Sequence, residues 1–78
     1  MEKSEILKKV GKRIKEVRLQ KGISQADLVG RMEGNIDATN ISRIEAGRTN
    51  PTVYTLFRIA EALEVNPKEL LDFDISQN

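Results

Sequence analysis

The sequence contains neither cysteine nor histidine. The lack of cysteine excludes disulfides and thiolate metal sites, and the lack of histidine removes the commonest metal ligand and general base. Asp72 and Asp74 resemble a metal pair, but the glycine and the other ligands of a calcium loop are missing around them. We therefore expect no enzyme, no metal site and no cofactor.

Long apolar runs are also missing, since no run of apolar side chains exceeds two residues. Such a chain has neither a membrane span nor the apolar stretch of a secretory signal. Its 78 residues suffice for one domain and leave no room for a separate ligand-sensing unit. We expect a cytoplasmic protein without a membrane partner or small-molecule ligand. It should form a single domain over residues 1–78, with an ordered core at 4–73 and a frayed tail at 74–78.

Charge is distributed unevenly along the chain. Residues 1–50 carry eleven basic and seven acidic side chains, a net charge of +4, whereas the remainder carries two basic and five acidic ones, a net charge of −3. A polyanion would be attracted to the first part and repelled by the second. Ordinary variation of surface charge is the alternative explanation of this pattern.

Apolar residues recur at steps of three and four, and no alternating pattern is long enough for a strand. The sequence therefore predicts an all-α fold. Residues that favour helix N-caps (Ser4, Ser24, Asp37) and helix-ending glycines set the expected boundaries. The expected helices span residues 4–21, 25–33, 38–46 and 52–64, with a last one beginning at Asn66. The fourth should be the central core helix, with a broad apolar face of Val53, Leu56, Phe57, Ile59, Ala60 and Leu63.

The short helix expected over residues 38–46 has only two obvious core residues, Ile41 and Ile44. Its other faces carry the small or polar residues Ala38, Thr39, Asn40, Ser42 and Arg43. A DNA major groove admits one helix, and such side chains hydrogen-bond base edges there, arginine bidentately to guanine. This segment is therefore a candidate reading helix, although solvated surface is the simpler alternative for Arg43 alone.

Several short motifs occur in an order that resembles the Cro and phage-repressor class of helix-turn-helix regulators, also called the Xre class. The resemblance covers residues 10–71 and rests on Ser24-Gln25-Ala26-Asp27-Leu28, Asn40-Ile41-Ser42-Arg43-Ile44-Glu45-Ala46-Gly47-Arg48, Asn50-Pro51, Thr55-Leu56 and Ile59-Ala60-Glu61-Ala62-Leu63. It implies a compact five-helix, lambda-repressor-like domain in which the second and third helices form the helix-turn-helix. It also implies a homodimer that binds double-stranded DNA at an inverted repeat.

The resemblance further implies roles for individual residues. Base reading falls to Thr39 and Arg43, with Ala38, Asn40 and Ser42 nearby, and phosphate contacts fall to Ser24, Gln25, Arg48, Thr49 and Asn50. Arg18 and Glu45 match a structural ion pair that fixes the reading helix against the first helix.

Two departures from the family pattern affect the register of the base contacts. Gln25 and Ile41 are sixteen residues apart, two more than usual, so the turn between the two helices must be longer. Val29 stands where the family has alanine at a close helix approach, and Gly30 beside it could relieve the crowding.

Aliphatic residues near the C-terminus exceed what one short helix needs to cap a core. We expect Leu70, Phe73 and Ile75 to form a homodimer interface, with Leu71 beside them. The leading interpretation is a sequence-specific transcriptional repressor or autoregulator at a short palindromic operator. An antitoxin or a protein-interaction adaptor with the same fold is the alternative. A phage-type repressor, a restriction-modification controller and an antitoxin remain equally compatible with the residues.

Overall fold

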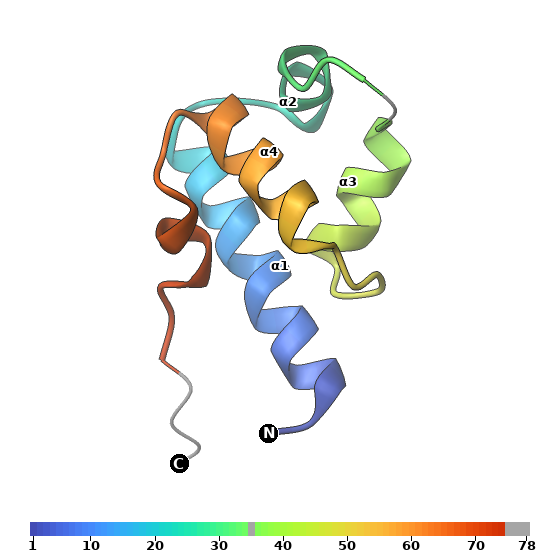
Figure 1. Cartoon of the computed structure of the whole chain (residues 1–78), viewed down its shortest axis with the longest axis vertical. Coiled ribbons are helices and arrows are strands. Elements are labelled where there is room, and N and C mark those ends of the chain that lie inside the picture. The colour runs from blue at the N-terminus through green and yellow to red at the C-terminus, as the bar shows by residue number, and fades with distance from the viewer. Residues whose placement is uncertain (35, 75–78) are drawn as a thin grey trace.

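The computed structural model describes residues 1–34 and 36–74, and the described residues contain helices and no strand. Four α-helices are followed by one 3-10 helix (Figure 1): α1 (Lys3–Gln20), α2 (Gln25–Arg31), α3 (Ala38–Glu45), α4 (Val53–Leu63) and η1 (Pro67–Leu71). The predicted all-α fold is confirmed. The predicted count of five α-helices is wrong, because the last element has the tighter 3-10 form that short terminal segments commonly adopt.

Local capping explains where most helices begin. The side chains of Ser24, Asp37 and Thr52 each accept a hydrogen bond from the backbone N–H three residues on, which satisfies a donor that the first helical turn leaves free. The prediction that Ser4 is the N-cap of the first helix is wrong. Glu2 occupies that position instead, and its backbone N–H donates to the Glu5 side chain at 3.3 Å. Most of the expected tail, residues 75–78, lies outside the described residues.

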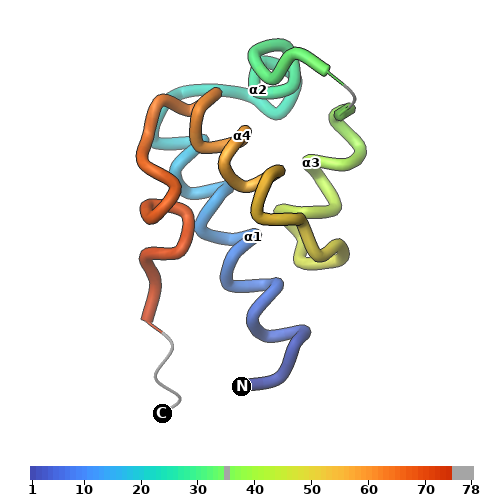
Figure 2. Tube along the Cα trace, in the orientation of Figure 1, coloured from blue at the N-terminus to red at the C-terminus, as the bar shows by residue number. Residues whose placement is uncertain are grey.

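The core takes residues from every element. Six large side chains have no exposed surface or almost none: Ile14, Leu28, Ile41, Ile59, Leu63 and Leu70. Figure 2 shows α1 running through the molecule, with α3 on one side and η1 on the other, and both contact α1. Because η1 contributes the buried Leu70, it belongs to the core.

The buried face of α4 is narrower than the apolar face predicted from the sequence. Ile59, Ala60 and Leu63 are fully buried, but Val53 and Phe57 are 70% and 56% exposed, and so these two were wrongly assigned to the core. Only one side of α4 is covered by other elements, the side that contacts α2 and η1. The other side remains open, and Tyr54 on it is also exposed.

The contact between α1 and α3 depends on a glycine. A Cβ atom at Gly11 would lie 2.3 Å from the backbone oxygen of Ile44 and 2.5 Å from that of Glu45. Any side chain would push the two helices apart, since real Cβ atoms do not approach backbone so closely. The role of Gly11 could not be predicted from the sequence, because a glycine inside a helix gives no local sign of a neighbour.

None of the helices in the described ranges is both long enough and apolar enough to cross a membrane.

Candidate nucleic-acid interface

α3 is held by two isoleucines and presents its other residues outward. Ile41 and Ile44 are buried in the core, and Asp37 caps the helix by accepting a hydrogen bond from the backbone N–H of Asn40 at 2.9 Å. All five side chains expected to read bases are exposed: Ala38, Thr39, Asn40, Ser42 and Arg43. A helix anchored on one face with a polar opposite face can enter a groove without disturbing its own packing.

The loop after α3 lies against α1. Gly47 has a φ of +75°, and a Cβ there would come within 2.8 Å of the Cα of Lys8. The backbone N–H of Arg48 donates to the carbonyl of Arg43 at 2.9 Å, which closes the end of the helix. The loop side chains Arg48, Thr49 and Asn50 are exposed, so they are free to meet a phosphate backbone beside the reading helix.

The start of α2 is fixed by a reciprocal cap. The Ser24 hydroxyl accepts from the backbone N–H of Asp27 at 3.0 Å, and the Asp27 carboxylate accepts from the backbone N–H of Ser24 at 3.2 Å. Hydrogen bonding of the Asp27 carboxylate to Ser24, to its backbone N–H first and to its side chain second, lowers the pKa of Asp27. Ser24 thus has a structural role at this helix, and its phosphate contact stays a prediction.

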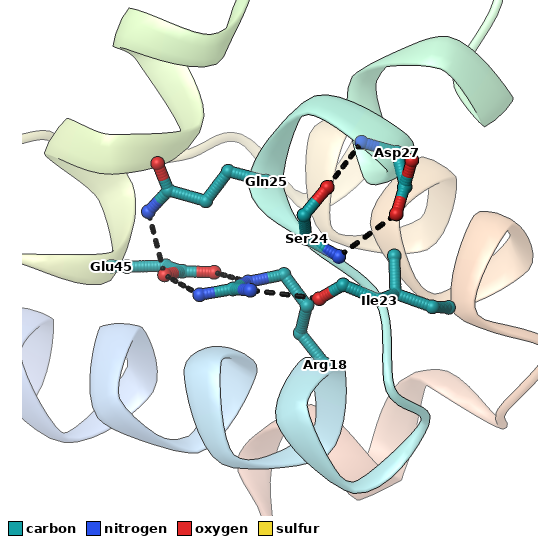
Figure 3. A network of polar contacts seen from close by, with 6 residues as sticks. All are labelled: Arg18, Ile23, Ser24, Gln25, Asp27 and Glu45. Carbon is teal, nitrogen blue, oxygen red and sulfur yellow. Dashed lines mark hydrogen bonds and ion pairs between the residues drawn. The ribbon is translucent and has the colours of Figure 1, made fainter.

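Glu45 joins three segments of the chain (Figure 3). Its carboxylate accepts from Arg18 Nε at 2.7 Å and Nη2 at 3.0 Å, and from Gln25 Nε2 at 3.0 Å. Arg18 also donates through Nη1 to the backbone oxygen of Ile23 at 2.8 Å. The hydrogen bond with Glu45 raises the pKa of Arg18, against the effect of burial, so the guanidinium stays charged.

This network ties the end of α3 to α1 and to the start of α2. Arg18 and Glu45 are only 6% and 8% exposed, so the pair is shielded from solvent. The Gln25 amide nitrogen carries two hydrogens, and one of them is used on Glu45. The predicted contact with a phosphate would use the second hydrogen.

A side chain of α4 holds the longer turn between α2 and α3 in place. Arg58 donates through Nη2 to the backbone oxygens of Met32 and Glu33, the first two residues after α2. Gly34 follows with a φ of +132°, and its missing side chain leaves space for the Arg58 guanidinium. The role of Arg58 could not be predicted from the sequence, because Arg58 lies 25 residues from Glu33 and no local pattern connects the two.

Val29 is half-buried against the core, so the larger side chain is accommodated at this position. Gly30 does not relieve any crowding there, since a Cβ at Gly30 would have no neighbour within 4 Å.

The residues expected at a homodimer interface differ in how much of their side chains is exposed. Leu70 was wrongly assigned to a surface, because it is completely buried by α1 and α4. Phe73 is half-buried and packs on the core, and Ile75 lies outside the described residues. Leu71 is 52% exposed.

Within the ranges that the structure describes, no three acidic side chains gather closely enough to hold a metal ion.

Two helices joined by a turn, with the second outward-facing and followed by a polar loop, define a helix-turn-helix unit. The family model described as "Helix-turn-helix" matches residues 14–70. The chain belongs to this family, as its motifs predicted.

Three known proteins illustrate the similarity. The HTH-type transcriptional regulator y4dJ of Sinorhizobium fredii is 38% identical over 64 residues, 82% of this chain and 80% of that protein. Control protein C.BamHI of Bacillus amyloliquefaciens is 39% identical over 64 residues, 81% of this chain and 76% of its own length. The crystal structure of the restriction-modification controller C.AhdI from Aeromonas hydrophila matches with a TM-score of 0.76 at 33% identity, covering 82% of this chain and 94% of that one. The chain is accordingly a DNA-binding transcriptional regulator and not an enzyme.

Proposed function

We propose that the chain is a sequence-specific repressor or autoregulator in the cytoplasm, which binds a short palindromic operator as a homodimer. The observation that carries the proposal is α3, where five exposed small or polar residues stand above two buried isoleucines. Thr39 and Arg43 are the central base-reading residues, and the neighbouring Ala38, Asn40 and Ser42 complete the surface.

Phosphate contacts on either side of α3 would orient it. Gln25 reaches the surface from the start of α2, and Arg48 with Thr49 and Asn50 lies beyond the end of α3. The net charge of +4 over residues 1–50 supports this side as the one that meets DNA. The acidic remainder, which includes α4, would then face away.

Autoregulation is the more specific part of the proposal. Two of the similar proteins are named as controllers, one of them of restriction and modification. Two copies would place their reading helices about one DNA turn apart, roughly 34 Å.

The test is selection of binding sites from random double-stranded DNA, followed by affinity measurements across a salt series. We expect enrichment of one short inverted repeat, with affinity that falls steeply as salt rises, because bound phosphates release counterions. A control DNA with both half-sites scrambled should retain only the weak, salt-sensitive binding. Failure to enrich any sequence would contradict the proposal.

A further inference from the structure

Two lysines of α1 lie on the edge of that helix that meets the end of α3. Lys8 and Lys15 stand three residues before and four residues after Gly11, and residues at these spacings share one face of a helix. Gly11 lies against the backbone oxygens of Ile44 and Glu45, in the last turn of α3. The two lysines therefore flank the contact that holds the reading helix.

Each lysine also lies next to a segment that we expect to contact phosphates. Lys8 packs against the loop after α3, since a Cβ at Gly47 would come within 2.8 Å of its Cα and of its Cγ. Lys15 is one turn before Arg18, which is bonded to the same carboxylate as Gln25 (Figure 3). This edge of α1 thus extends from one predicted phosphate-contacting segment to the other.

Neither lysine is neutralised within the part of the chain that the structure describes. Both side chains are exposed, and neither forms an ion pair with a residue of the described ranges. The acidic side chains of α1 are engaged elsewhere, because Glu5 accepts a hydrogen bond from the backbone of Glu2 and Glu16 pairs with Arg13 at 3.6 Å. The edge therefore carries two positive charges that are available to a polyanion.

We infer that Lys8 and Lys15 bind phosphates of the DNA backbone, so that α1 forms a third phosphate-contacting segment beside the start of α2 and the loop after α3. The inference rests on the proposed function, because it takes α3 as the helix that enters the major groove. Seven residues of helix separate the two lysines by about 10 Å along α1, which equals about three steps of one DNA strand. Contacts with phosphates carry no base preference, so both lysines add affinity without selecting a sequence.

The test is the salt dependence of DNA binding by the full chain, measured by fluorescence anisotropy on the selected operator and on a duplex of scrambled sequence. Each phosphate contact contributes about 0.9 to the slope of log K against log salt concentration. Lys8→Gln and Lys15→Gln should each lower the slope by about this amount per bound chain, and the double variant by about twice as much. The double variant should lose on the order of 10-fold or more in affinity near 0.1 M salt, on both DNAs.

Two matched double variants separate a direct contact from a general effect of charge. Lys9 borders a hollow with Phe73 on another side of α1, and Lys68 is exposed on η1. Lys9→Gln/Lys68→Gln removes the same net charge as the test variant and should keep the wild-type slope. Lys8→Arg/Lys15→Arg keeps both charges on the proposed edge and should also keep it. Circular dichroism melting would verify that each variant remains folded.

The inference is wrong if the folded glutamine variants of Lys8 and Lys15 keep the wild-type slope on both DNAs. It is also wrong if Lys9→Gln/Lys68→Gln lowers the slope equally, or if the arginine double variant loses it. Random DNA that yields no enriched sequence, with a slope that still depends on Lys8 and Lys15, would contradict the proposed function and leave the α1 contact standing. An enriched palindrome bound with a slope independent of both lysines would contradict only this inference.

Discussion

Gln25 donates a hydrogen bond to Glu45 at 3.0 Å, and the same oxygen of Glu45 accepts from Arg18 at 3.0 Å. The residue that we expect to touch a phosphate is therefore bonded to the ion pair that anchors the reading helix. The expected contact with the DNA backbone and the position of α3 both depend on one buried carboxylate.

Gln25→Ala should weaken binding to every DNA sequence about 5-fold, the effect of losing one hydrogen bond of about 1 kcal/mol. The preferred base sequence should not change, because the exposed side chains of α3 that are expected to read bases remain the same. Titration of the operator and of scrambled DNA would measure both effects. Gln20→Ala, at an exposed glutamine at the end of α1, is the control. A change of sequence preference in Gln25→Ala would contradict a phosphate role.

Glu45→Gln should lower the free energy of unfolding by about 3 kcal/mol or more, because it leaves the buried charge of Arg18 without its partner. Urea denaturation would measure this loss as a lower midpoint at constant slope. Glu33→Gln provides the comparison, since the Glu33 side chain is exposed, and it should change stability by less than about 0.5 kcal/mol. Similar stabilities of the two variants would show that the ion pair contributes little.

Gly11→Ala and Gly30→Ala should have opposite effects. The new methyl group at Gly11 meets backbone at 2.3 Å and forces α1 and α3 apart, so we expect a loss of about 2 kcal/mol and weaker DNA binding. At Gly30 there is open space, and alanine should stabilise α2 by about 0.5 to 1 kcal/mol. Thermal melting distinguishes the two signs. Tolerance of alanine at Gly11 would mean that the helix contact is looser than described.

The lowered pKa of Asp27 predicts a pH dependence of stability. A carboxyl group whose pKa is lower in the folded state stabilises that state above its unfolded pKa of 3.8. This contribution is lost as the pH falls from 3.8 through the lowered folded value. Asp27→Asn should therefore be less stable than the wild type at neutral pH, and the difference should shrink in acid. Urea midpoints from pH 7 to about pH 2 would test this, and a difference independent of pH would contradict it.

Arg43→Ala and Arg48→Ala should separate base reading from phosphate binding. Loss of Arg43 should cost roughly 1 to 3 kcal/mol on the preferred operator and relax the preference at one base position. Loss of Arg48 should weaken all sequences alike and reduce the salt dependence by about one phosphate. Binding of each variant to single-base operator variants would measure the difference. Equal effects of both substitutions on every sequence would contradict the assigned roles.

Local features of the fold could be predicted because their causes are local. Capping by Ser24 and Asp37 and the burial of Ile41 and Ile44 follow from residues within a turn or two of each other. The resemblance to a family located the helix-turn-helix and paired Arg18 with Glu45, which periodicity could not have done. The ends of the helices were predicted less accurately. The helix α2, for example, ends at Arg31, two residues before its predicted end.

The amino-acid sequence by itself determined the helices, their order and the identity of the outward-facing residues on α3. Only the tertiary structure decided that Gly11 admits α3, that Arg58 holds the longer turn, that Leu70 lies inside and that Phe57 lies outside. Each of these depends on which distant segment covers a given side chain. Periodicity shows that a helix has an apolar face, but only packing determines how much of that face is covered.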